Sequence, residues 1–225
     1  MGLELYSEIE ELFLDKEAAN MLWGSFLDIA KELNIKNLLD IGCGGGDFCL
    51  MAKEAGIDVK GVDLSLAQVK KATKKGCNCE NINICEMNEK FEAASAIFDV
   101  INYMDKNELK KFFSCVEKVV EKYFIFDVNT FYAMDELAIG NLKAEDDKKF
   151  ATLFSEFEDN KLITEITLFE KKENNSYIKK QKSITQYYYS LEDIEKLINM
   201  KLKNMIPISL YGSKEAEKLI LVFEK

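Results

Sequence analysis

The sequence predicts a doubly wound α/β protein, in which helices cover both faces of a mostly parallel sheet. Short apolar runs that suit buried strands alternate with amphipathic helical segments as far as Thr130. The first run, Asn37–Ile41, passes into a glycine-rich turn, and the second, Asp58–Asp63, closes on an acid. A turn and an acid at the carboxyl ends of parallel strands are typical of a nucleoside-binding site.

The expected elements of this half are two helices followed by repeated strand–helix units. Gly56 is expected to end one helix, and Ser65 with Gln68 forms a capping-box pattern at the start of the next. We expect helices over 5–14, 17–33, 47–55 and 65–76, and a further one that begins at Asp105. We expect strands over 37–41, 58–63, 82–85, 98–103 and 123–128.

After Thr130 the pattern changes to antiparallel β structure. A polar, helix-like stretch runs to about Lys149, and strand-like runs separated by turn-forming residues follow it. We expect an antiparallel β insert with strands over 150–158, 161–170 and 177–189, joined through 159–160 and 173–176. A helix from Ser190 and strands over 203–211 and 218–223 then complete the main sheet, the last strand antiparallel.

These elements divide the chain into parts of one large domain with ample core. The expected parts are an N-terminal helical lid over 1–36, a cofactor-binding core over 37–130, an antiparallel β insert over 131–189 that covers the acceptor site, and a C-terminal part of the sheet over 190–225.

Composition narrows the classes of function. The formal net charge is −10, and phosphate backbones are bound by clusters of Lys and Arg, so we expect no nucleic-acid partner. The sequence shows neither an apolar run long enough to span a membrane nor a signal peptide, so we expect a cytoplasmic protein with no membrane partner.

The numbers and spacing of cysteine and histidine narrow the classes of function further. The six cysteines fit reduced cytosolic thiols better than a disulfide framework. Cys77, Cys79 and Cys85 lack the paired spacing of zinc sites, so we predict no metal. The chain has no His, which removes most nucleophilic triads from consideration.

Asp40 separates two classes of cofactor. A dinucleotide fingerprint needs a third glycine where this chain has Asp47. Two unit charges about 4 Å apart interact by roughly 4 kcal/mol at an effective dielectric near 20. An ionised Asp40 would therefore oppose a pyrophosphate and favour the ammonium of S-adenosylmethionine (SAM). Asp63 is expected to accept the ribose hydroxyls, as an acid at this spacing does.

In these segments the chain resembles the class I SAM-dependent methyltransferases. The segment 38–48 is similar to motif I, 61–65 to the ribose-binding motif, and 85–87 to the adenine-reading pair, with Glu86 in place of Asp. The segments 98–103 and 123–130 resemble the fourth and fifth strands. The resemblance implies a Rossmann-like, seven-stranded sheet. Some small-molecule members, including enzymes that methylate amino sugars, carry a similar β insert over the acceptor site.

The resemblance also implies the residues of the site. The expected cofactor contacts are Asp40, Gly42, Cys43, Gly44, Asp63, Leu64, Glu86, Met87 and Asn102. Asn129 and Tyr132, just past the fifth strand, are the expected acceptor contacts, and Asp127 and Tyr103 are the candidates for a catalytic role.

Structural interpretations of the same residues stay open. Asp40 can cap a helix, and the glycines can serve only a tight turn. Glu86 can be exposed and Met87 part of the core. Tyr187–Tyr189 is better explained as a strand face than as an aromatic cage.

Three functions remain, of which the first is a SAM-dependent methyltransferase that acts on a small molecule by in-line displacement. With no evident base, positioning alone or a nitrogen acceptor is favoured. The loop after the expected strand 98–103 is shorter than in the family, so a SAM-binding sensor or partner subunit is the alternative. An NAD-dependent oxidoreductase is the third.

Overall fold

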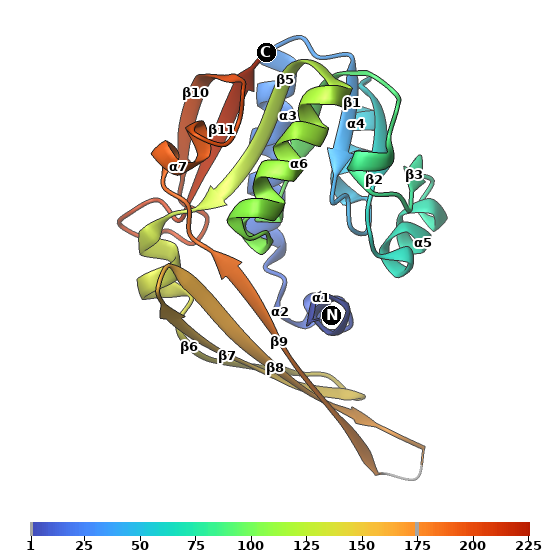
Figure 1. Ribbon diagram of the computed structural model, residues 1–225. Helices are drawn as coiled ribbons and strands as arrows, with labels where there is room; N and C mark the ends of the chain where they lie inside the picture. The colour runs from blue at the N-terminus through green and yellow to red at the C-terminus, as the bar shows by residue number, and fades with distance from the viewer. Residues whose placement is uncertain (1, 174–175) are drawn as a thin grey trace.

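Residues 2–173 and 176–225 are described by a computed structural model, which shows a main sheet covered by helices and a smaller second sheet (Figure 1). The main sheet contains β1 (Asn37–Ile41), β2 (Asp58–Val62), β3 (Cys79–Glu80), β4 (Phe91–Ala96), β5 (Val120–Asn129), β10 (Lys201–Ile208) and β11 (Lys218–Glu224). The strand order is β10-β11-β5-β4-β1-β2-β3. Only β11 runs antiparallel to its neighbours. This topology confirms the predicted fold class.

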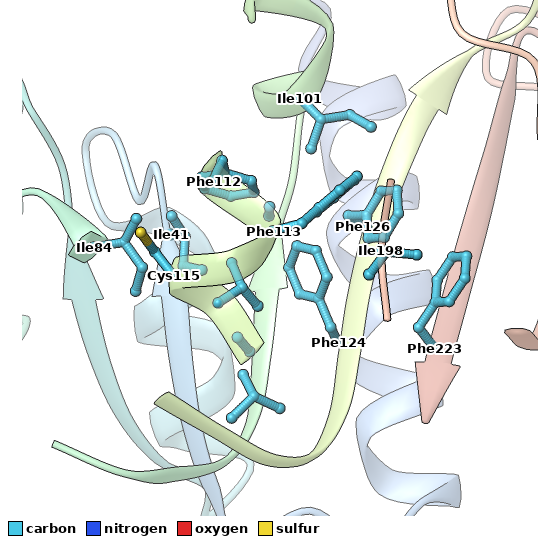
Figure 2. Packing of buried hydrophobic residues seen from close by; sticks show 14 of the residues in the cluster. Ile41, Ile84, Ile101, Phe112, Phe113, Cys115, Phe124, Phe126, Ile198 and Phe223 are labelled. Atoms are coloured by element: carbon cyan, nitrogen blue, oxygen red, sulfur yellow. The ribbon is translucent and has the colours of Figure 1, made fainter. Parts of the chain in front are cut away.

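Helices cover the two faces of the main sheet. They are α3 (Lys16–Glu32), α4 (Asp47–Glu54) and α5 (Leu66–Lys74) on one face, and α6 (Lys106–Val119) and α7 (Leu191–Glu195) on the other. On the α6 face the core is aromatic, because Phe113 packs on Phe126 and Phe126 stacks on Phe223 at 5.6 Å between ring centroids (Figure 2). Burying such rings stabilises the fold by roughly 1.5–3 kcal/mol each.

Local capping signals act where the sequence predicts them. The Asp105 carboxylate accepts the amide protons of Asn107 and Glu108, and Glu108 accepts the amide proton of Asp105 in return. Ser65 accepts the amide proton of Gln68 at the start of α5. Each cap satisfies amides that have no partner within their own helix.

Two predicted strands are wrong. Strand β3 ends before Ile82, and the predicted strand 82–85 contains instead the short 3-10 helix η1 (Ile84–Glu86). The fourth strand lies seven residues earlier than its predicted start, at β4, and 98–103 contains the 3-10 helix η2 (Val100–Tyr103). Phe91–Ala96 is rich in alanine, whereas 98–103 carries the larger apolar residues that the prediction followed.

The β insert is a four-stranded antiparallel sheet rather than a three-stranded one. Its strands are β6 (Gly140–Glu145), β7 (Lys149–Glu158), β8 (Lys161–Lys171) and β9 (Tyr177–Tyr187). The added strand β6 replaces part of the predicted helix, of which only the π-turn η3 (Ala133–Leu137) remains. Asn174 and Asn175, within the predicted join 173–176, lie outside the described residues.

The N-terminal helices pack on this insert. The predicted helix 5–14 is two short helices, α1 (Gly2–Ser7) and α2 (Glu10–Phe13). Leu5 and Ile9 are buried in a cluster with insert residues that include Ile166, Leu168 and Ile184. On the other side, the Gln68 amide of α5 donates to the Glu10 carboxylate at 2.7 Å. The segment thus bridges the insert and the main domain, while its role as a lid stays a prediction.

The cysteines differ from the expected set of free thiols. Cys85 in η1 and Cys115 in α6 form a disulfide, whereas Cys43, Cys49, Cys77 and Cys79 are free. Spacing along the chain gave no sign that η1 and α6 lie side by side. Among the described residues, every helix is too short or too polar to cross a membrane.

Candidate cofactor and acceptor site

The glycine-rich turn after β1 needs glycine for steric reasons. Gly42 and Gly44 have φ values of +74° and +51°, which other residues rarely adopt. A Cβ on Gly42 would lie 2.8 Å from a methyl group of Val100, whereas one on Gly44 would point into open space. The turn therefore leaves an open face at Gly44, where a ligand can approach the backbone.

Asp63 stands beside that open face, directly after β2. Its carboxylate accepts the amide protons of Gly44 at 2.9 Å and of Ser65 at 2.7 Å, one on each oxygen. Each oxygen keeps a second lone pair, so the group can still accept two hydroxyls. Leu64 beside it is 68% exposed and offers an apolar surface to a base. These residues fit the ribose and adenine of a nucleoside.

Asp40 has a different setting from the one that the charge argument assumed. Its side chain is buried, and its two oxygens accept hydrogen bonds from the Ser95 hydroxyl at 2.9 Å and the Cys49 thiol at 3.4 Å. Burial raises the pKa of Asp40 to about 7, against the opposing effect of these two bonds. The carboxylate therefore carries only part of a charge near pH 7, and the choice of cofactor cannot rest on it.

The other residues expected near the cofactor divide into exposed and buried ones. Glu86 is exposed at the end of η1, whereas Met87 is 8% exposed and belongs to the α6-side core. Cys43 is buried, and its amide donates to the Val62 carbonyl. A direct cofactor contact from any of these side chains stays a prediction.

Asn102 and Tyr103 lie in η2 and not at the end of a strand. The Asn102 amide is fully buried, donates to the Tyr187 carbonyl at 2.8 Å and accepts the Asn129 amide proton at 3.3 Å. It therefore ties η2 to β5 and to the insert. Burial, with the charge of Asp99 adding to it, raises the pKa of Tyr103 well above its ordinary value, so its phenol stays protonated near neutral pH and is not available as a base.

Asp127 belongs to a buried ionic cluster at the carboxyl edge of the sheet. It is fully buried, and its carboxylate accepts the amide protons of Phe98 at 2.7 Å and Asp99 at 3.2 Å. Lys218, which begins β11, donates to Asp127 at 2.9 Å, to Asn129 at 3.0 Å and to Asp99. These contacts leave Asp127 as a positioning group rather than one exposed to an acceptor.

Lys218 and Asp99 are site residues that sequence reasoning missed. Phe98 and Asp99 both adopt positive φ values, 65° and 64°, which are unusual for residues other than glycine and often mark functional sites. Burial alone would lower the pKa of Lys218, but the Asp127 and Asp99 carboxylates outweigh it and raise the pKa. Nothing in the local sequence marks Lys218, because it reaches the cluster only through the pairing of β11 with β5.

Two tyrosines lie near enough to this cluster for its charges to shift their pKa values. The pKa of Tyr6 in α1 is raised to about 12, first by burial and then by the charge of Asp99. Burial also raises the pKa of Tyr211, with the charge of Lys218 opposing the rise and that of Asp99 adding to it. The Gln186 amide of β9 donates to Asp99 at 3.4 Å. Asp99 thus lies where the N-terminal helices, the insert and the main sheet meet.

Asn129 also borders a small cavity of about 80 Å³ lined by Phe131, Tyr188 and Tyr189. This volume is below the range of small-molecule pockets, which is about 300–1,000 Å³. Tyr132 is half-buried just before η3. Acceptor contacts from Asn129 and Tyr132 stay predictions.

Comparisons with known proteins agree with this geometry. Residues 38–122 match the family model described as a methyltransferase domain. A curated relative from Geobacillus sp. (strain WCH70), described as a "Putative methyltransferase", is 27% identical over 159 residues, which are 63% of this chain and 64% of the relative. The chain thus aligns with less than two thirds of that relative's length.

Solved structures show the same fold along the whole chain. A SAM-dependent methyltransferase from Clostridium acetobutylicum ATCC 824 superposes with a TM-score of 0.77 at 21% identity, over 99% of this chain and 96% of that one. The sugar N-methyltransferase KedS8 from Streptoalloteichus sp ATCC 53650 gives 0.74 at 14% identity, over 99% and 93%. Residues 38–122 thus match a methyltransferase domain, and the chain as a whole shares the fold of SAM-dependent methyltransferases.

Proposed function

We propose that this protein binds SAM along the carboxyl edge of β1 and β2 and transfers its methyl group to a nitrogen of a small-molecule acceptor. When bound, SAM supplies a methyl group already activated on a sulfonium. Asp63 would hold the ribose, Gly44 would allow the close approach of the ligand to the backbone, and Leu64 would cover the adenine. The family match supports a methyltransferase and offers no support for an NAD-dependent oxidoreductase.

The length of the loop after the fourth strand bears on activity, because an apparently short loop was the reason for the sensor alternative. Because β4 ends at Ala96, the segment from Ile97 to Asp105 connects it to α6, whereas the predicted strand ending at Tyr103 left almost no loop. The family's acceptor loop therefore has a counterpart here.

The observation that favours an amine acceptor is the charge of the buried cluster. Asp99 and Asp127 together carry two carboxylates against the single ammonium of Lys218. Asp99 is the more accessible carboxylate, with 19% of its side chain exposed against none of Asp127. Excess negative charge near Tyr6 and Tyr211 suits a cationic amine, by Coulomb attraction.

Asp99 then has a defined task in the reaction. A protonated amine must lose its proton before its lone pair can attack, and the Asp99 carboxylate is placed to take it. The remaining work is orientation of the nitrogen behind the methyl carbon, which can supply roughly 7–11 kcal/mol of the barrier. No other group has to act as a nucleophile.

Turnover with a panel of small amines and hydroxyl compounds tests the proposal. We expect S-adenosylhomocysteine to form from SAM with members of the amine set and not with the matched alcohols. Thermal stabilisation by SAM without turnover across the panel would favour the sensor or partner-subunit alternative. Stabilisation by NAD and not by SAM would overturn both.

A variant at Asp99 tests its role. Asp99→Asn keeps a residue that tolerates positive φ but removes the base, so we expect kcat/KM to fall by about 10²–10⁴. The Kd for S-adenosylhomocysteine should stay unchanged. Asp105→Asn is the matched control, because Asn also caps a helix. Equal activity of the two variants would remove Asp99 from the mechanism.

A further inference from the structure

Three cysteine sulfurs meet directly beneath the glycine-rich turn. Cys43 lies in the turn, Cys49 in the first half of α4, and Cys79 opens β3. Their sulfur atoms all lie within 4.8 Å of one another, and those of Cys43 and Cys79 are 3.7 Å apart. This set differs from the Cys77, Cys79 and Cys85 group that the sequence brings together, because the sheet and not the spacing assembles it.

The sulfur separations suit a thiophilic metal ion. Zinc binds thiolates at about 2.3 Å in a tetrahedron, which places neighbouring sulfurs about 3.8 Å apart. The Cys43–Cys79 separation is already at that value, and the widest separation would have to close by about 1 Å at most. Each of the three side chains has a rotatable Cα–Cβ bond with which to do so.

Asp40 lies beside one of the three sulfurs. One of its oxygens lies 3.4 Å from the Cys49 sulfur, close to the S–O edge of about 3.5 Å expected around zinc. Its other oxygen accepts from the Ser95 hydroxyl, the kind of outer contact that orients metal ligands. Asp40 is therefore the candidate for an oxygen donor to complete the three sulfurs.

A glycine on the neighbouring strand keeps room for the sulfurs. A Cβ on Gly61 of β2 would lie 2.7 Å from the Cys79 sulfur and 2.8 Å from the Cys43 sulfur. Any other residue at this position would push the two sulfurs aside. Cys49 also borders a surface cavity of about 440 Å³.

We propose that Cys43, Cys49 and Cys79, with Asp40 as the oxygen donor, bind one thiophilic divalent cation of the zinc type. Three sulfurs and one oxygen select such an ion over Mg²⁺ or Ca²⁺, which prefer all-oxygen sites. Binding displaces the thiol protons, and the proton of any protonated Asp40 carboxyl, to solvent, and no oxidant or reductant is needed. The ion would join the turn, α4 and β3, and so stiffen the backbone that the proposed function places against SAM.

Metal titration of the reduced, chelator-stripped protein tests the site without any need for SAM. We expect about one Zn²⁺ to be retained per chain after gel filtration, measured by elemental analysis, and a rise in melting temperature with Zn²⁺ but not with Mg²⁺. Cd²⁺ should add a thiolate-to-metal charge-transfer absorbance in the ultraviolet.

Matched variants distinguish the three proposed cysteine ligands from the remaining free cysteine. Cys49→Ser and Cys43→Ser should each weaken Zn²⁺ binding by about 100-fold or more. Changing a residue that only orients a metal ligand typically weakens binding by about 10–100-fold, and these variants remove a ligand itself. Cys77→Ser, a nearby buried free cysteine outside the cluster, should bind as the wild type does. Circular dichroism without metal identifies any variant that has failed to fold, and the two serine variants serve as independent replicates. Absence of stoichiometric Zn²⁺ on the wild type, or equal binding by Cys49→Ser and Cys77→Ser, would overturn the proposal.

Discussion

At the scale of single residues, two acids at the sheet edge have opposite settings. Asp63 is half-buried, bonded to the turn and able to accept further hydroxyls. Asp127 is fully buried and already bonded to Lys218 and to two backbone amides. The first is therefore suited to ligand binding, whereas the second holds the chain around Asp99 in place.

Removing the Asp63 carboxylate should weaken cofactor binding. A hydrogen bond to a charged group contributes about 1.5–3 kcal/mol, so Asp63→Asn should raise the Kd for S-adenosylhomocysteine by about 10–100-fold. Asp58→Asn, at the exposed start of the same strand, should leave the Kd unchanged. Calorimetric titration of both variants provides the measurement, and equal Kd values would place the ribose elsewhere.

Removing the Lys218 ammonium should destabilise the whole domain. Lys218→Met leaves Asp127 and Asp99 without their cation, so we expect the free energy of unfolding to fall by about 3–5 kcal/mol near neutral pH. Lys201→Met on the neighbouring strand β10 is the matched control, because Lys201 is exposed. Urea unfolding of both variants measures the difference.

The Lys218 effect should depend on pH. Burial raises the pKa of Asp127 from 3.8 to about 6, with Lys218 opposing the rise. Between these values the folded state binds a proton that the unfolded state lacks, so stability falls as pH rises through this window. Without Lys218 the folded pKa moves higher and the window widens upward. The gap between wild type and Lys218→Met should therefore grow as the pH rises above about 6; a constant gap would contradict this account.

At the scale of elements, the 3-10 helices decide the shape of the site. η1 carries the predicted adenine-side residues, and the disulfide between Cys85 and Cys115 ties it to α6. η2 is held by Asn102, which bonds to both β5 and β9. Neither helix is long enough to be stable alone, so long-range contacts fix both.

Breaking the disulfide should loosen η1. The bridge closes a loop of 30 residues, and the chain-entropy account gives a stabilisation of about 3–4 kcal/mol for that length. We expect Cys85→Ser to lose stability relative to the wild type under oxidising conditions and to match it after reduction. Cys77→Ser keeps the bridge, so its difference in stability from the wild type should be the same with and without reductant. Denaturant melts with and without reductant make this test.

At the scale of the whole molecule, the N-terminal helices lie between the insert and the main domain and contact both. Leu5 and Ile9 are buried against the insert, and Glu10 bonds to α5 of the main domain. The segment therefore brings Tyr6 near Asp99, to which Gln186 of β9 is also bonded. Access to the region around Asp99 should depend on how firmly the helices are packed.

Two leucines of α1 make a matched pair for this packing. Leu5→Ala removes a side chain that is 5% exposed and should cost about 2–4 kcal/mol. Leu3→Ala removes the same atoms at 41% exposure and should cost less than about 0.5 kcal/mol. Limited proteolysis near the N-terminus should be faster for Leu5→Ala alone. Equal costs would show that α1 is not held on the insert.

Four features could be predicted from the sequence alone: the class of fold, the glycine-rich turn, the acid after β2 and the alternating strands of the insert. These features are set by local patterns, namely periodicity, caps and turn chemistry, and such patterns need only neighbouring residues. The short strands 82–85 and 98–103 were wrong because a brief apolar run does not distinguish a strand from a 3-10 turn.

The contacts between side chains far apart in the sequence are known only from the tertiary structure. Lys218 and Asp127 are 91 residues apart in the chain and meet because their strands pair. The three sulfurs come from a turn, a helix and a strand. The tertiary structure also decided that Asp40 is buried, because burial depends on which neighbours pack around the end of β1. Contacts of this kind arise from sheet order and register, which no local stretch of sequence encodes.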